Sequence, residues 1–499
     1  MMLATALTVM AIVTQDQTAL RAAPRDSAPQ QVQLAQGESL EVRGQKGDFL
    51  QVWDHRRERG GYLRATQVRR YTLNAESAPA LLAVTQFVRD TPGQEALGIS
   101  HAAAFLHAAP AEAITPEAFD ALGTMADRLA RRASQSRGKA GDVLTAQQLE
   151  VVAAYGVSMQ SFERDGQMQI CYDGEAFRRV MALPKSTPEQ KARAALALTR
   201  HDCVSPTLTP TERASLDAWR YDVLSRVDTT PLPEHLKNRI HMRRAGVLSA
   251  IAYQQARRNE NPMETAQRAL GSLAAINKSE LTEDDANSYS DAAVRVGAVR
   301  WAAELPGKPA SLSLTTRAGQ PGETCIQLID AKENKKIAGP SQDFRSPPGG
   351  QPGPNGPGGG ASSAVFERCT WGTVWTASAS VNAQRTAVTV AVQTGETWRE
   401  LWLFRKGEEG WNVDVIPPSA NFTTEGPAIG YIEFAGWVPG NQQILAAREV
   451  RVDGRYKRSF EILNLDSLQV ARWADRFESL AAFYKWQDPR WKGTTVSVR

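Results

Sequence analysis

Residues 12–71 carry short runs in which apolar and polar positions alternate with a period of two. Leu40 and Val42 alternate in one run, and a turn over Gly44–Gly47 leads into the next, Phe49–Trp53. Gly and Pro residues separate these runs, as they separate the strands of small β modules. The pattern therefore predicts a small closed β-barrel of about five strands.

From residue 75 to residue 305 the apolar period changes to about 3.6, which predicts an α-helical domain. Four helix starts are marked by Thr or Asn followed by Pro, because the side-chain oxygen caps an amide and Pro fits the first turn. They are Thr115-Pro116, Thr187-Pro188, Thr209-Pro210 and Asn261-Pro262. Glu or Gln completes a capping box at the last three, and Thr282 starts a further helix. The starts are unevenly spaced, which favours a bundle or irregular stack over a tetratricopeptide array.

Residues 311–499 return to strand-like runs and predict an all-β domain. A Pro/Gly tract at residues 346–360 is expected to be a disordered loop. Beyond it, two successive units of four strands are expected, over 374–380, 387–392, 400–404 and 411–416, and over 431–437, 443–449, 459–464 and 468–473. Asp475–Trp486 is expected to form a closing helix, and Val496 and Val498 a last strand.

Four strands per unit, with an aromatic residue near each turn, resemble the blades of a β-propeller. A closed propeller usually needs at least four blades, and only two or three units are visible. The alternatives are an incomplete pair of blades and a two-sheet sandwich. The expected fold class is therefore multidomain α+β, with a small barrel, a helical bundle domain and a propeller-like or sandwich domain.

The first of these regions resembles the bacterial SH3 (SH3b) family. The motifs that carry the resemblance are Leu20-Arg21, Leu34-x-x-Gly37-x-x-Leu40-x-Val42, Gly47-Asp48-Phe49-Leu50-Gln51-Val52 and Gly61-Tyr62-Leu63. Two departures are Tyr62, where the family has Trp, and the absence of Asn-Val before Arg21. The resemblance covers about an eighth of the chain and implies a module that binds peptidoglycan or peptides.

Two groups of residues in this region are candidates for ligand binding. Phe49, Trp53 and Tyr62 are expected to line a groove, with barrel core as the alternative. Arg56 and Arg57, in a basic run with Arg64, Arg69 and Arg70, are expected to contact anionic wall polymers or lipid head groups. The alternative for that run is a solvated surface. Four tryptophans of the predicted β domain offer either a sugar or peptide platform or ordinary packing: Trp398, Trp402, Trp411 and Trp437.

Composition places the chain among folded multidomain proteins. It has 499 residues, of which 42% are hydrophobic and 22% charged. A net charge of +4 does not favour nucleic-acid binding. No apolar run is long enough for a transmembrane segment. Residues 1–11 are apolar and uncharged and end in Val9-Met10-Ala11, which is typical of the end of a signal peptide. The alternative is that they begin the first strand of the barrel.

The four cysteines are an even number, which fits an oxidising compartment. Three connectivities are possible. Pairing within each predicted part is the simplest of them, and it gives Cys171–Cys203 and Cys325–Cys369.

Few residues suggest catalysis. The chain contains no P-loop, G-x-G-x-x-G, G-x-S-x-G or H-E-x-x-H motif. His201-Asp202-Cys203 resembles the turn that carries the nucleophile in cell-wall peptidases of the NlpC type, but its glycine is missing. His235 and His241 lie in a helical pattern. A zinc site of Cys171, His201 and Cys203 lacks the usual spacing. No metal and no cofactor are expected.

The sequence thus predicts a periplasmic or secreted, non-catalytic cell-envelope protein whose barrel binds peptidoglycan or an envelope protein. One alternative is a cell-wall hydrolase with Cys203 as nucleophile. Another is a structural, chaperone-like protein whose barrel only assists folding. The ligand, the pathway and the oligomeric state do not follow from the sequence.

Overall fold

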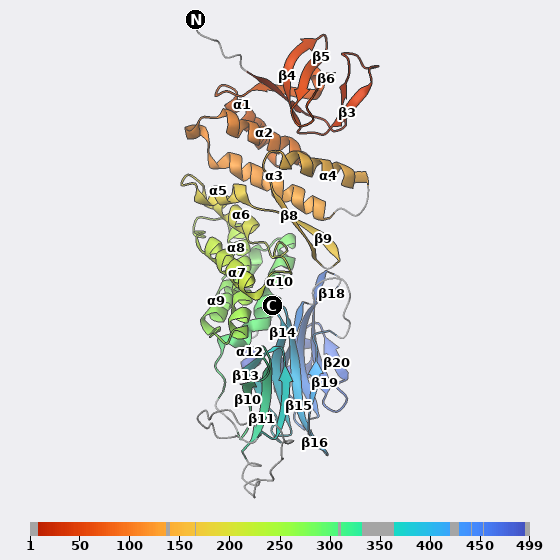
Figure 1. The fold of residues 1–499 in the computed structure, drawn as a ribbon. Helices are drawn as coiled ribbons and strands as arrows, with labels where there is room; N and C mark the ends of the chain where they lie inside the picture. Colours follow the sequence, from red (N-terminus) through yellow and green to blue (C-terminus); the bar gives the residue numbers. More distant parts are fainter. Residues whose placement is uncertain are drawn as a thin grey trace, which may run out of the picture. The chain divides into compact units, whose positions relative to one another are not determined.

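A computed structural model describes residues 8–135, 140–164, 166–307, 311–331, 364–419, 429–440, 442–452 and 454–494. The protein mixes α-helices with several β-sheets and divides into two compact units (Figure 1). Unit 1 comprises Met1–Thr209 and Asp222–Leu236, and unit 2 comprises Pro210–Tyr221 and Lys237–Arg499. The boundary falls within the helical segment predicted over 75–305, so each unit contains helices and sheet.

Unit 1 begins with a seven-stranded antiparallel sheet. Its strands are β1 (Val9–Val13), β2 (Thr18–Arg21), β3 (Gln30–Leu34), β4 (Ser39–Lys46), β5 (Phe49–Asp54), β6 (Arg59–Arg64) and β7 (Val68–Thr72). They follow the order β3-β2-β6-β5-β4-β1-β7. Over the described residues β3 and β7 remain edge strands, so the expected closed barrel is not formed. The β2–β3 hairpin joins the rest through the single pair Arg21–Tyr62, and no pairing of β3 with β7 closes the sheet over the described residues.

The sheet has one core, formed by alternate residues of its strands. Its buried members are Val13, Leu20, Leu34, Leu40, Leu50, Val52 and Leu63. On β5 the buried Leu50 and Val52 alternate with Gln51 and Trp53, which point to the opposite face. The period-two pattern of the sequence therefore identifies the core side of this sheet correctly.

Strand β1 is buried on both faces. Val13 packs in the sheet core, while Ile12 packs with helix residues such as Leu81 and Leu97. Ala11, expected at the end of a signal peptide, is fully buried and pairs with Leu40 of β4. The alternative interpretation, a first strand, describes residues 9–13, whereas residues 1–7 lie outside the described part of the chain.

Removal of residues 1–11 is expected to loosen this sheet, whereas removal of residues 1–7 is the matched control. The longer deletion removes the pairs of residues 9–11 with β4 and β7, and it leaves the neighbouring amides without partners. Hydrogen exchange should show protection in β4 and β7 falling by roughly tenfold or more in the longer deletion alone. Equal protection in the two proteins would contradict the role of β1.

Helices cover this sheet within unit 1 and continue beyond it. They are α1 (Ala78–Arg89), α2 (Glu95–Ala108), α3 (Pro116–Ser134), α4 (Ala140–Ala153), α5 (Glu175–Ala182) and α6 (Pro188–Leu198). Gly37 fits against α2 because it has no side chain: φ is +91°, and a Cβ atom would lie 2.7 Å from the Ala96 carbonyl oxygen. Tyr155 Oη donates to the Gly37 carbonyl oxygen at 2.6 Å. The turn at Gly37 therefore lets the sheet pack closely against α2.

Local signals fix several elements of unit 1. Thr187 and Gln190 form the predicted capping box at the start of α6. Thr115 precedes α3 without a side-chain cap bond. The strand expected near Cys171 is β9 (Gln167–Tyr172), and its hairpin partner β8 (Met159–Arg164) was not predicted from the sequence.

Two helices have residues in both units, and further helices belong to unit 2 alone. They are α7 (Pro210–Ser225) and α8 (Glu234–Arg257), followed in unit 2 by α9 (Met263–Ala274), α10 (Glu283–Val299) and the short 3₁₀ helix η4 (Arg300–Ala303). Thr282 caps α10 by accepting from the Asp285 amide. Asn261 accepts from the Met263 amide, so α9 begins one residue later than the Asn-Pro signal indicates.

The strands of unit 2 form a three-stranded sheet and two four-stranded meanders. The small sheet contains β10 (Leu312–Ala318), β11 (Thr324–Asp330) and β12 (Phe366–Thr370). The first meander is β13 (Thr373–Val381), β14 (Ala387–Gly395), β15 (Trp398–Gly407) and β16 (Gly410–Ile416); the second is β17 (Gly430–Trp437), β18 (Gln443–Val452), β19 (Arg455–Asn464) and β20 (Val470–Ala474). The eight predicted strands thus appear in order.

The two meanders share a core. A short parallel pairing of β15 with β17 links them, and the cluster that contains Leu401, Leu403, Ile432 and Phe434 draws side chains from both. Trp437 Nε1 at the end of β17 donates to Ser380 Oγ of β13 at 3.0 Å, although these strands are three places apart in the sheet order. Such a contact requires the second meander to fold back over the first, since neighbouring strands lie about 4.8 Å apart.

The remaining faces of the meanders are covered as well. The three-stranded sheet packs on the outer face of the first meander. The short helices α11 (Ala481–Trp486) and α12 (Pro489–Thr494) pack on the second. The predicted helix over Asp475–Trp486 is therefore limited to its last part, after the 3₁₀ turn Phe477–Ser479. The Pro/Gly tract 346–360, Val496 and Val498 lie outside the described residues.

Candidate functional site

The predicted aromatic residues of the N-terminal sheet lie on its outward face. Phe49 and Trp53 alternate along β5 with the buried core, and Tyr62 of β6 pairs directly with Gln51 between them. Residues that alternate on neighbouring strands share one face, so Tyr62 is a diagonal neighbour of both rings. The structure therefore brings the three candidates together.

Each of these rings is covered by a basic side chain. The guanidinium carbon of Arg43 lies 4.4 Å from the Trp53 ring centroid, and that of Arg64 lies 5.1 Å from the Phe49 centroid. Lys46 Nζ lies 5.7 Å from the Tyr62 centroid. These distances are within the range of cation–π attraction. The aromatic face is defined here as Phe49, Trp53 and Tyr62 with these three basic residues.

The three rings differ in exposure. Phe49 is 7% exposed beneath Arg64, whereas Trp53 and Tyr62 are half-buried. Gly60 lies opposite Trp53, and a Cβ atom there would come within 3.3 Å of the indole. Phe49 therefore supports the aromatic face from beneath, while Trp53 and Tyr62 each keep part of their side chain exposed to solvent.

Acidic side chains partly neutralise the edges of this face. Glu41 accepts from Arg43 and contacts His55 Nε2 at 2.7 Å; these hydrogen bonds hold the pKa of the Glu41 carboxyl below its usual value. Arg64 pairs with Asp26 and likewise lowers the pKa of that carboxyl. Lys46 has no acidic partner among the ion pairs of the described residues. Residues 8–72 contain ten Lys and Arg against seven Asp and Glu, which leaves the module basic.

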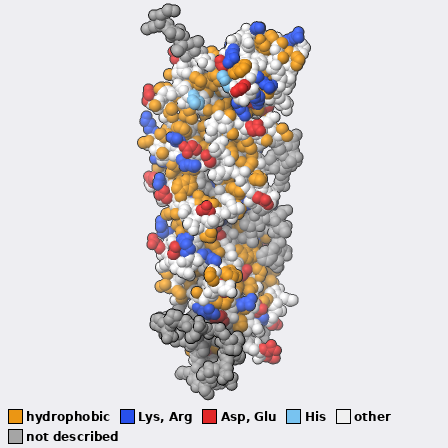
Figure 2. Space-filling view, in the orientation of Figure 1, with side chains coloured by type: hydrophobic (Ala, Val, Ile, Leu, Met, Phe, Trp, Pro, Cys, Tyr) orange, Lys and Arg blue, Asp and Glu red, His pale blue; other side chains and the backbone are white. Residues whose placement is uncertain are grey.

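The two other predicted contact residues lie elsewhere. Arg57 binds Glu38 at 2.6 Å and Asp54 at 2.7 Å, and both carboxylates are buried. Its guanidinium is therefore paired with two buried carboxylates, while the side chain itself remains partly exposed. Arg56 is exposed, and its backbone amide donates to Asp54. Figure 2 shows Lys and Arg side chains over these N-terminal strands, among hydrophobic ones.

The four tryptophans that were expected to form either a platform or ordinary packing are packing residues. Trp398, Trp402 and Trp411 are buried, and Trp437 is half-buried with its indole N–H bonded to Ser380. None of them resembles an exposed platform. The alternative interpretation, ordinary packing, describes all four.

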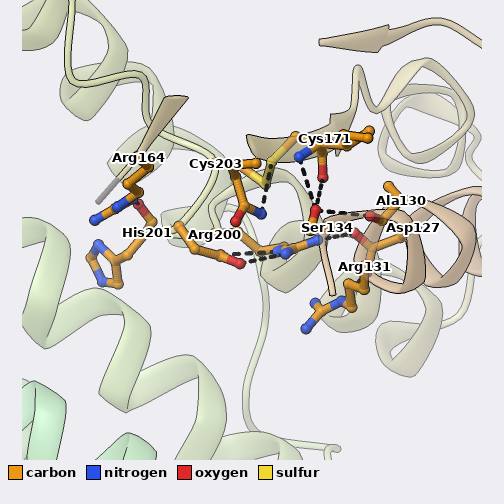
Figure 3. The surroundings of a disulfide bond; sticks show 12 residues. Asp127, Ala130, Arg131, Ser134, Arg164, Cys171, Arg200, His201 and Cys203 are labelled. Carbon is orange, nitrogen blue, oxygen red and sulfur yellow. Dashed lines mark hydrogen bonds and ion pairs between the residues drawn. A yellow bond between two sulfur atoms is a disulfide. The ribbon is translucent and has the colours of Figure 1, made fainter. Parts of the chain in front are cut away.

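Cys203 is joined to Cys171, one of the two pairs expected from the sequence, and Cys325 is joined to Cys369. All four cysteines are therefore in disulfides. Around Cys203 the buried Arg200 binds Asp127 at 2.5 Å and also pairs with Asp202. Figure 3 shows the His201 imidazole pointing away from the Cys171–Cys203 bond. In this state Cys203 has no thiol to serve as nucleophile or zinc ligand.

A buried ionic cluster in unit 2 was not foreseen from the sequence. Glu433 of β17 accepts from Arg300 Nε at 2.5 Å and from Arg399 of β15 at 2.8 Å through one oxygen, and from Trp491 Nε1 at 3.1 Å through the other. Arg399 also donates to the Gly297 carbonyl oxygen of α10 at 2.5 Å. All four side chains of the cluster are almost fully buried. The cluster connects α10, η4 and α12 to the meanders, so its role is to stabilise the fold of unit 2.

Comparisons of the chain with protein-family models, with curated proteins and with solved structures find no match. Within the described residues, none of the helices is both long enough and apolar enough to cross a membrane.

Proposed function

We propose that the chain is an exported, non-catalytic protein of the cell envelope whose SH3b-like module binds peptidoglycan or a protein peptide through the aromatic face. The observation that carries this proposal is the pairing of three rings with three basic side chains on one outward sheet face. Half-buried Trp53 and Tyr62 offer flat apolar surface with a polar edge. Arg43 and Lys46 offer charge to the carboxylates of a wall peptide.

The rest of the molecule supports a scaffolding role. Two disulfides favour an oxidising compartment, such as the periplasm or the cell exterior. The folded-back meanders favour a two-sheet sandwich over a pair of propeller blades, because their shared core lies between them. We infer that α1 and α2, which pack against β1 within unit 1, hold the module in place for its ligand.

The test is co-sedimentation of the full-length protein with purified sacculi. Trp53→Ala with Tyr62→Ala is expected to weaken binding at least about tenfold, since buried aromatic anchors dominate such interfaces. Phe49 is left intact because it is only 7% exposed and its loss would disturb folding. Higher salt should weaken wild-type binding, because Arg43 and Lys46 contribute charge.

The matched control is Phe87→Ala, since Phe87 is an aromatic residue of α1 that is 83% exposed and lies outside the aromatic face. Its binding should equal that of the wild type. Circular dichroism checks that both variants fold. Retention of the folded Trp53/Tyr62 variant at the wild-type level would refute the assignment and favour the structural, chaperone-like alternative.

The hydrolase alternative has less support. It requires a Cys203 thiolate beside a base, whereas the sulfur is bonded to Cys171 and the imidazole of His201, two residues earlier in the chain, points away from it. Wall-degrading activity that disappears in Cys203→Ala would favour the hydrolase.

A further inference from the structure

A second group of potential ligand atoms lies on the three-stranded sheet of unit 2. Glu323, Cys325 and Cys369 place a carboxylate oxygen and two sulfurs within 4.8 Å of one another. Among the described residues, no other group of three or more His, Cys, Asp or Glu side chains meets this spacing. Cys325 is buried, while Glu323 and Cys369 are half-buried, so the group is reachable from solvent.

The backbone holds the two sulfurs together whether or not they are bonded. Cys325 of β11 and Cys369 of β12 are directly opposite in an antiparallel pair, and β11 and β12 pair from Thr324–Thr370 to Leu328–Phe366. Side chains of directly opposite residues project to the same face. Reduction of the disulfide therefore leaves the two thiols side by side, because the ladder remains on both sides of them.

Glu323 completes the group from the turn that precedes β11. It lies two residues before Cys325, and one of its carboxylate oxygens is within 4.8 Å of both sulfurs. The Gln320 amide donates to Glu323 Oε2 at 3.0 Å, which orients the carboxylate in the turn before β11. Arg317 of β10 lies directly opposite Cys325 and forms an ion pair with Glu367. Gln327 also donates to Glu367, at 2.8 Å. The neighbouring cation is thus balanced by a different acid.

We infer that reduction of the Cys325–Cys369 disulfide creates a site for a thiophilic d¹⁰ metal ion such as Zn²⁺ or Cd²⁺, with two thiolates and the Glu323 carboxylate as ligands. Two sulfurs on a tetrahedral zinc, each at about 2.3 Å, lie about 3.8 Å apart, a spacing that neighbouring strands provide. Two thiolates and a carboxylate form a ligand set that such ions accept, with water in the fourth position.

The chemistry balances with a dithiol reductant. The disulfide takes up two electrons and two protons and becomes two thiols, while the reductant becomes a disulfide. Binding of the divalent ion then releases the two thiol protons. The Cys171–Cys203 bond lacks such a third ligand in the described residues. The site would therefore respond to redox conditions in unit 2, independently of the aromatic face.

The test is titration of the full chain with Cd²⁺ after reduction by a phosphine, followed by the absorbance of thiolate-to-metal charge transfer. The reduced wild type is expected to bind one ion at this site, and the oxidised protein none there. Glu323→Gln should weaken binding at least about tenfold, and Cys325→Ser should abolish the site. Cys171→Ser with Cys203→Ser should retain it.

Three results would overturn the inference: no uptake by reduced wild type, equal uptake by the oxidised protein, or unchanged affinity in Glu323→Gln. Circular dichroism of each reduced protein shows whether it remains folded. Should the Cys171/Cys203 variant unfold, Cys325→Ser and Glu323→Gln alone still decide the outcome, since each leaves the other disulfide positions unchanged.

Discussion

Replacement of Glu433 by Gln is expected to lower the free energy of unfolding of unit 2 by about 3–5 kcal/mol. The carboxylate is the shared partner of Arg300 and Arg399, and all three side chains are buried. The amide keeps the size of the side chain but removes its charge, so two cations remain in the interior without compensation. Urea denaturation of the full chain, followed by circular dichroism, measures the loss.

The matched control for this change is Glu260→Gln. Glu260 pairs with Arg258 at 2.7 Å, but this pair is exposed. Exposed pairs contribute little to stability because water and salt screen them, so the control should remain close to the wild type. Equal effects of the two substitutions would mean that the buried cluster does not hold the helices to the meanders.

The same cluster predicts the direction of acid destabilisation. Burial opposes ionisation of Glu433, but the charges of Arg300 and Arg399 prevail and hold the pKa of its carboxyl below the usual value. A carboxyl whose folded pKa is depressed stabilises the protein above its unfolded pKa, and this stabilisation disappears as the pH falls through the folded pKa. The stability of Glu433→Gln should therefore depend less on acid pH than that of the wild type.

The second large effect is expected in unit 1, where loss of the Cys171–Cys203 bond should cost roughly 3–4 kcal/mol. The two cysteines are 32 residues apart, so the bond closes a substantial loop in the unfolded chain. It ties β9, whose Ile170 amide and carbonyl both bond to Ser134 of α3, to the segment after α6. Replacement of both cysteines by Ser avoids a leftover thiol.

Thermal and urea unfolding of the Cys171→Ser/Cys203→Ser protein measure this cost. The control compares the oxidised wild type with the reduced wild type. Reduction should lower the free energy of unfolding of unit 1 by a comparable amount. A double variant as stable as the oxidised wild type would show that hydrogen bonds around Ser134 and Arg200 hold β9 without the bond.

The sequence was informative where local rules dominate. The eight strands of the meanders follow from alternation between turn residues, and the start of α6 follows from Thr187 and Gln190, whose capping bonds form within four residues. The outward position of Trp53 and Tyr62 follows from the same period of two. Each of these features depends on residues that are close in the chain.

The sequence was uninformative where distant residues meet. Glu433 and Trp491 are 58 residues apart, and Glu433 and Arg300 are 133 apart, so no spacing indicates that they share a buried site. The ion pair between Arg57 and Glu38 was not predicted, because the two residues are 19 positions apart in the chain. A local pattern also could not predict whether the N-terminal sheet closes into a barrel, because closure depends on pairing between the two end strands, β3 and β7.

The oxidation state of the native protein tests the account most directly. Native material is isolated from each cellular fraction without reductant, free thiols are alkylated, and the four cysteines are read by mass spectrometry. The account predicts protein in the envelope or the medium with Cys171, Cys203, Cys325 and Cys369 all unmodified by the alkylating agent. Cytosolic protein with an alkylated Cys203 would contradict it.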